Sequence, residues 1–271
     1  MTIGDPTAPG PYRAYRPVRS LAPGGRPAPV LLLIAHGSRD PRHAATVEAL
    51  VGQVRGVRPG TPVATAYLDH CAPRIPQVVQ RLADSGTAAV AVPLLLGNAY
   101  HARTDIPGAL RGTGLPVATV LGPSPLLLAA LDRRLAEAGL DLRSPAVRGR
   151  TGVVLASAGS SDPAANAATR EVAAEWQRTR GWAAVEVAHA SAVPPHVPEA
   201  VAALRGAGAE RIAVAPYLIA PGLLPDRIAS AAAAAGADLA APVLGAAPEL
   251  ARLLLARYDA ARAAATTALT A

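Results

Sequence analysis

The chain has 271 residues, of which 51% are hydrophobic, so it is long enough for two ordinary domains with sizeable cores. All 26 Lys/Arg residues are arginine and the formal net charge is +7, but only 3% of residues are aromatic, which argues against a nucleic-acid-binding surface. A single cysteine excludes an intramolecular disulfide framework, and no apolar run approaches the about 18 residues of a membrane span. We therefore expect a globular cytoplasmic protein that binds neither nucleic acid nor membrane.

Residues 1–28 are rich in proline, glycine and arginine and show no periodicity. Such a segment buries too little apolar area to offset the entropy of ordering it, so we expect a disordered leader. It holds four arginines against one aspartate, which leaves the remainder only mildly basic. A modest surplus of arginine suits a small polyanionic substrate, because guanidinium groups pair with carboxylates in two-pronged geometry.

The segment from Val30 to Ala35 is apolar throughout, too short for a helix and followed at once by His36. It predicts a strand buried on both faces, as in a parallel sheet. After His36, a Gly-Ser turn leads to Asp40, a helix-capping residue, and Pro41, which suits the first helical position. His36 should therefore lie at the carboxyl end of a strand, where ligands bind in open α/β sheets.

Strands and helices then alternate. We expect helices near 41–55, 74–85, 102–111 and 124–138 and strands near 62–68, 88–96 and 116–120, followed by a linker over 141–150.

The same order begins again after this linker. Gly159, Ser160, Asp162 and Pro163 repeat, 122 positions later, the turn after the first strand, but Ala158 stands where His36 would be. We expect an α/β fold of two similar domains, each a small parallel sheet with helices on both faces, related by internal duplication. Their expected bounds are 29–140 and 151–264, with a tail at 265–271.

Polar residues follow three predicted strands of the first domain: His36, Asp69 and His101. Because parallel strands end at one edge of the sheet, these side chains should converge there. Two imidazoles and a carboxylate suit a divalent transition metal with open coordination positions. The alternative for each residue is ordinary packing or turn chemistry.

The other histidines point less clearly to chemistry. His70 should face away from Asp69, and His43 should be a solvated position in the first turn of a helix. His189 corresponds to Tyr67 near the end of its strand, and whether it contributes to a cleft between the domains stays open. Asp105 can accept hydrogen bonds from nearby amides or from Arg103.

The residues 35–41, Ala-His-Gly-Ser-Arg-Asp-Pro, together with Pro93-Leu94-Leu95 and the stretch 101–106, resemble the sirohydrochlorin chelatases. The resemblance covers about residues 30–264 and is to the long, two-domain form of these class II chelatases. It implies a lyase that inserts a divalent metal, Fe²⁺ or Co²⁺, into sirohydrochlorin in sirohaem or cobalamin biosynthesis, with the metal as substrate and without an organic cofactor.

The resemblance also implies roles for individual residues. His36 and His101 would hold the metal, with Asp69 as third ligand or proton acceptor where the family usually has Glu. The substrate-binding residues would be Ser38, Arg39, Arg42, Tyr100 and Arg103, since arginines suit the eight carboxylates of the macrocycle and Tyr100 offers a flat surface to its ring. The two domains would mimic a dimer within a monomer.

Two other functions stay open on the sequence. A histidine phosphatase-like phosphotransferase also has a strand-end His-Gly, although its pattern needs arginine where Ala35 stands. A non-catalytic tetrapyrrole or metal carrier would share the duplication. Metal insertion into sirohydrochlorin separates the three.

Overall fold

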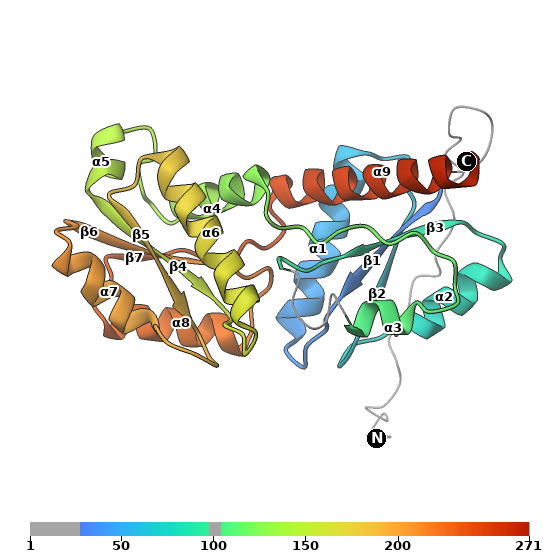
Figure 1. Cartoon of the computed structure of the whole chain (residues 1–271), viewed down its shortest axis with the longest axis horizontal. Coiled ribbons are helices and arrows are strands. Elements are labelled where there is room, and N and C mark those ends of the chain that lie inside the picture. Colours follow the sequence, from blue (N-terminus) through green and yellow to red (C-terminus); the bar gives the residue numbers. More distant parts are fainter. Residues whose placement is uncertain (1–27, 98–103, 271) are drawn as a thin grey trace, which may run out of the picture.

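The computed structural model describes residues 28–97 and 104–270; the expected leader and the stretch with Tyr100, His101 and Arg103 lie outside this part. Two α/β halves lie side by side, the first on the right of Figure 1 and the second on the left. The first-half sheet has the strand order β2-β1-β3 and the second-half sheet β5-β4-β6-β7, and all pairings are parallel. The predicted fold class is thereby confirmed.

The elements of the first half of the chain are β1 (Val30–Ala35), α1 (Pro41–Val57), β2 (Val63–Tyr67), α2 (Ile75–Asp84), β3 (Ala89–Pro93), α3 (Ile106–Ala109) and α4 (Pro125–Glu137). Those of the second are α5 (Pro145–Arg150), β4 (Thr151–Ser157), α6 (Pro163–Arg180), β5 (Ala184–His189), α7 (Val197–Gly206), β6 (Arg211–Pro216), α8 (Leu223–Ala234), β7 (Leu239–Ala240) and α9 (Pro248–Thr270).

Strand β1 is buried on both faces, as its continuous apolar sequence predicts. Because side chains alternate along a strand, Leu31 and Leu33 belong to the core under α1 and α9, whereas Leu32 and Ile34 belong to the core under α2 and α3. The central strand thus joins two layers of helices and has no solvated face.

The two halves start their first helices in the same way. Asp40 accepts a hydrogen bond from the Arg42 amide at the start of α1 (2.9 Å), and Asp162 accepts one from the Ala164 amide at the start of α6 (2.9 Å). A proline follows each of these caps. The duplication inferred from the sequence therefore extends to the hydrogen bonds of the turn.

Helices α4 and α9 are exchanged between the halves. Helix α4 contacts β6, and its Asp132 accepts a hydrogen bond from the Trp176 indole of α6 (2.8 Å). Helix α9 returns to the first half, where Figure 1 shows it along the sheet, and the Tyr258 hydroxyl donates to the Pro29 carbonyl (2.7 Å). The domain bounds 29–140 and 151–264 stay a prediction. Two helices, α4 and α9, pack across the boundary between these ranges.

Three expected elements differ in detail. The expected linker 141–150 contains α5, and α9 continues through most of the expected tail. The expected strand 116–120 makes a single bridge, between Val117 and Ala91.

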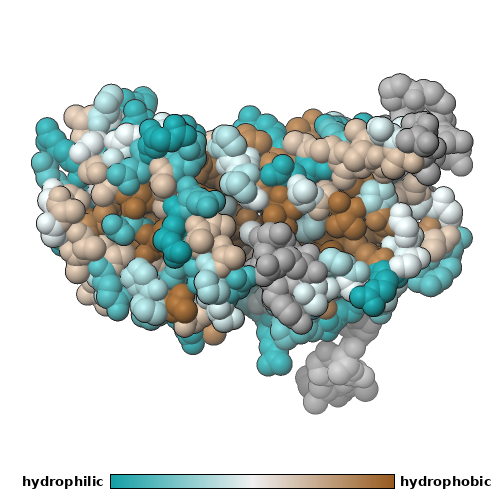
Figure 2. All heavy atoms as spheres, viewed as in Figure 1, coloured by the Kyte–Doolittle hydropathy of each residue, from teal (hydrophilic) through white to brown (hydrophobic). Residues whose placement is uncertain are grey.

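None of the described helices is long and apolar enough to cross a membrane. On the face in Figure 2, apolar side chains gather on the first half below α9.

Candidate active site at the strand ends of the first half

His36 lies at the carboxyl end of β1, as predicted, and is half-buried. Its carbonyl accepts a hydrogen bond from the Asp69 amide (2.8 Å), which ties the end of β1 to the end of β2. Its Nδ1 lies 3.0 Å from the Gly37 carbonyl oxygen. Because a carbonyl only accepts, Nδ1 is the donor in this contact, which leaves Nε2 as the ring nitrogen able to bind a metal in the neutral tautomer.

Gly37 allows the loops after β1 and β2 to touch. It has φ +91°, and a Cβ there would lie 1.7 Å from the Asp69 carbonyl oxygen. No other residue type fits this contact without moving one of the loops. The Cys71 thiol adds a hydrogen bond to the Ser38 carbonyl (3.2 Å), so both loops form one structural unit around His36.

The Asp69 carboxylate is held by its own turn. Its Oδ1 accepts from Arg74 Nη1 (2.7 Å) and from the His70 amide (2.8 Å), and Arg74 also donates to the Leu68 carbonyl (2.7 Å). The Arg74 guanidinium, followed by the His70 amide, keeps the pKa of Asp69 below its usual value. The carboxylate is charged and half-exposed. It can therefore contact a metal or accept a proton while it also stabilises its turn.

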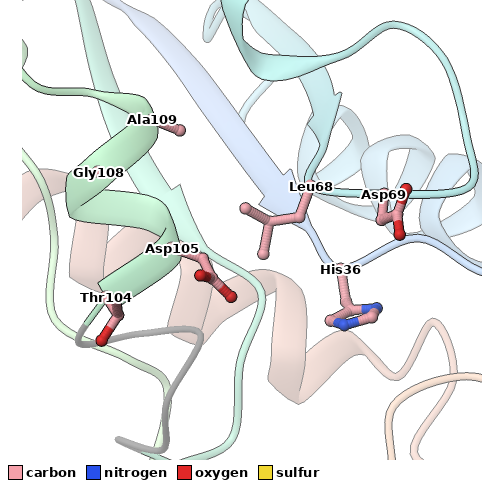
Figure 3. A pocket seen from close by; sticks show the side chains of 7 residues that line it. All are labelled: His36, Leu68, Asp69, Thr104, Asp105, Gly108 and Ala109. Carbon is pink, nitrogen blue, oxygen red and sulfur yellow. The ribbon is translucent and has the colours of Figure 1, made fainter.

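A pocket of about 460 Å³ opens at this edge of the sheet (Figure 3). His36 and Asp69 lie on one side of it, Thr104 and Asp105 at the start of α3 lie on the other, and Leu68 lies between them. Asp105, which lines the pocket, was not among the predicted site residues. Its position directly before a helix that has proline at its start could have indicated it.

The predicted ligand set is only partly within the described residues. His36 and Asp69 line one pocket, as expected from their strand ends. His101, Tyr100 and Arg103 lie outside the part of the chain that the structure describes. Within that part no three His, Cys, Asp or Glu side chains form a metal-binding group, so the three-residue ligand set stays a prediction.

The predicted substrate-binding residues of the first loop have different surroundings. Arg39 is exposed, and the Ser38 hydroxyl accepts a hydrogen bond from the Asp40 amide (3.1 Å). Arg42 forms ion pairs with Asp40 and, across the two halves, with Asp226, both at 2.6 Å. No local sequence pattern indicates this second partner, which lies 184 positions away.

Two histidines outside the pocket are packed rather than solvated. His43 is half-buried with its ring 6.4 Å from that of Tyr67, so the prediction of a solvated helix position is wrong. Burial, and secondarily the charge of His36, lowers the pKa of His43. His189 is buried and shares a 2.8 Å hydrogen bond with Ser157; it packs inside its own half instead of facing a cleft.

The second half keeps the loop geometry of this site without its chemistry. Gly159 has φ +82°, and a Cβ there would lie 2.2 Å from the Ser191 carbonyl oxygen, the same close contact as between Gly37 and Asp69. Ser191 takes the place of the carboxylate and Ala158 that of the histidine. The strand-end pair of His36 and Asp69 therefore has no counterpart at the equivalent positions of the second half.

Fold and site define a duplicated parallel-sheet α/β protein with a histidine and a carboxylate at the strand ends of one half. The family model named CbiX matches residues 30–138 and again residues 152–261. The chain belongs to the CbiX family.

Curated relatives agree with this assignment. A sirohydrochlorin cobaltochelatase of Priestia megaterium is 27% identical over 76% of this chain and 69% of its own length. A sirohydrochlorin ferrochelatase of the same organism is 26% identical over 73% of this chain and 76% of its own length. SirB from Bacillus subtilis, solved with Fe³⁺, has the same fold, with a TM-score of 0.73 at 21% identity over 86% of this chain and 94% of that one.

Proposed function

We propose that this chain is a sirohydrochlorin chelatase, a lyase-class enzyme that inserts Fe²⁺ or Co²⁺ into sirohydrochlorin in sirohaem or cobalamin biosynthesis. The observation that carries the proposal is the pairing of His36 with Asp69 in one pocket of a CbiX-family chain. The two curated relatives, named for cobalt and for iron insertion, support the reaction class.

The chemistry requires a metal to be held loosely and two protons to leave. We propose that His36 Nε2, His101 and Asp69 hold the divalent metal as substrate, and that Asp69 or an imidazole accepts the protons released by two pyrrole nitrogens. Nitrogen and oxygen ligands bind several first-row metals, so metal supply rather than this donor set selects iron or cobalt.

The macrocycle needs contacts around its edge. We propose that Arg39, Arg42 and Arg103 bind its peripheral carboxylates, with Ser38 and Tyr100 beside them, because guanidinium groups bind carboxylates in a bidentate way. We further propose a cytoplasmic monomer without nucleic-acid partner or organic cofactor.

The test incubates the purified chain with metal-free sirohydrochlorin and Co²⁺ or Fe²⁺ without oxygen and follows the absorbance change on metal insertion. Wild type should accelerate insertion, and His36→Ala should lose at least about a hundredfold because a metal ligand is gone. His196→Gln, which changes an exposed histidine of the second half, is the matched control and should retain activity.

The other outcomes separate the alternatives. Binding of sirohydrochlorin without faster insertion would favour a carrier. Phosphorylation of His36 by a phosphate donor, with no effect on insertion, would favour a phosphotransferase. Unchanged insertion in His36→Ala would contradict the proposed site.

A further inference from the structure

Arg42 is shared by two carboxylates, one from each half. Its Nε donates to both oxygens of Asp40 (3.1 and 3.0 Å) and its Nη2 to Asp40 Oδ2 (2.6 Å). Its Nη1 and Nη2 also donate to the two oxygens of Asp226 (3.2 and 2.6 Å). Both contacts are bidentate, so four of the five N–H bonds are directed at carboxylates of the protein.

The two carboxylates are held differently. Asp40 also accepts from the Arg42 amide as the cap of α1, and its side chain is 22% exposed. The Asp226 side chain, in the first turn of α8, is 54% exposed, and within the described residues its hydrogen bonds all go to Arg42. Exposed ion pairs are weak, so Asp226 is the partner that another carboxylate would displace.

The pair connects the helix that follows His36 to the second half of the chain. Arg42 lies six residues after His36, in the first turn of α1, while Asp226 belongs to the opposite half. Arg42 also lines a groove of about 440 Å³ between α1 and the second-half loops at Pro221 and Pro242. A ligand that takes Arg42 from Asp226 therefore also removes a link between the halves.

We propose that Asp226 is an affinity-determining residue: its carboxylate occupies Arg42 in the free protein, and a peripheral carboxylate of the substrate must displace it. The inference rests on the proposed function, because it needs a polycarboxylate substrate. Asp226 acts as an internal competitor for the Arg42 guanidinium. Loss of the charge should therefore strengthen substrate binding.

The test measures the dissociation constant for metal-free sirohydrochlorin by quenching of tryptophan fluorescence. Asp226→Asn should lower this constant by roughly three- to tenfold, because a bidentate surface ion pair no longer has to be broken before the substrate binds Arg42. The matched control is Asp259→Asn. Asp259, on α9, pairs with Arg58 of α1 through two hydrogen bonds (2.8 and 2.7 Å), so this variant also breaks a bidentate ion pair of α1, but away from Arg42. Its constant should stay within about twofold of wild type.

A double-mutant cycle identifies Arg42 as the group released. In an Arg42→Gln background, Asp226→Asn should give no gain, since no guanidinium is left to compete for. Equal constants for Asp226→Asn and wild type, or a gain that persists without Arg42, would overturn the inference. A wild-type protein that fails to bind sirohydrochlorin would instead overturn the proposed substrate, and the inference with it. Urea unfolding of each variant checks that the fold is intact.

Discussion

At the scale of single residues, the two oxygens of Asp69 have different surroundings. Oδ1 accepts from Arg74 and from the His70 amide, while Oδ2 lies 3.4 Å from His70 Nε2, so the prediction that His70 faces away from Asp69 is wrong. A ligand or proton acceptor needs the charge, whereas a turn residue needs only the acceptor oxygen at Oδ1. Substitutions separate the two roles because asparagine keeps that oxygen and loses the charge.

We therefore expect Asp69→Asn to lower the insertion rate by roughly ten- to a thousandfold, the range of lost ligand support and lost acid–base help. Asp69→Glu should retain much of the activity, since glutamate keeps the negative charge that a ligand or proton acceptor needs. If Asp69→Asn resembles wild type and Asp69→Glu is destabilised in urea, Asp69 acts only in its turn.

The activity lost in Asp69→Asn should not depend on pH between 6 and 8. Arg74 lowers the pKa of Asp69, so the carboxylate stays charged as the pH falls from 8 to 6. The factor lost in Asp69→Asn should be the same at both values. A factor that shrinks toward pH 6 would mean that a group titrating in that range, not Asp69, carries the effect.

How far the sequence predicts the site depends on the range of each contact. The place of His36 and Asp69 follows from the strand and turn residues beside them, which act locally. The Asp226 partner of Arg42 and the packing of His43 on Tyr67 depend on how distant elements dock, and no local pattern records that. Asp105 is intermediate, because its helix start is visible in the sequence but its distance from His36 is not.

At the scale of elements, the close contact between the two strand-end loops recurs in both halves. Gly37→Ala and Gly159→Ala each force a Cβ against a carbonyl oxygen at positive φ, which should lower the free energy of unfolding by at least about 1–3 kcal/mol. Gly56→Ala, in α1 with open space around it, is the control and should stabilise slightly.

Activity of the folded fraction then distinguishes the halves. Gly37→Ala moves the loop that carries His36, so insertion should fall by roughly tenfold or more, because small displacements of a reacting group are costly. Gly159→Ala should leave insertion within about twofold of wild type. Equal losses in both variants would contradict the assignment of the chemistry to the first half.

At the scale of the whole molecule, the exchange of α4 and α9 makes the halves depend on each other. Arg58 on α1 binds Asp259 on α9, and Arg133 on α4 binds Glu249 on α9 (2.7 Å for each closest pair). The buried residues of both sheets facing these helices form one continuous core. The alternating pattern of strands and helices predicts each half, but not this exchange, because the sequence of an amphipathic helix does not say which sheet it covers.

The exchange predicts what an isolated first half would do. A chain of residues 29–140 lacks α9, so the face of its sheet with Leu31, Leu33 and Val92 would be exposed. Its own α4 would lack the second-half surface on which Asp132 binds Trp176. Helices α4 and α9 each come after the last strand of their respective halves, so two copies can each place α4 where α9 lies in the intact chain.

We therefore expect residues 29–140 to form a homodimer, while the intact chain is a monomer. Light scattering should give twice the mass of the half, and its unfolding midpoint in urea should rise with protein concentration, because unfolding is then coupled to dissociation. Leu131→Asp in the half, at a fully buried position of α4, should abolish the dimer. Arg133→Gln, on the half-exposed side of the same helix, should leave it intact. A stable monomeric half with a concentration-independent midpoint would show that α9 is dispensable and that each half folds alone.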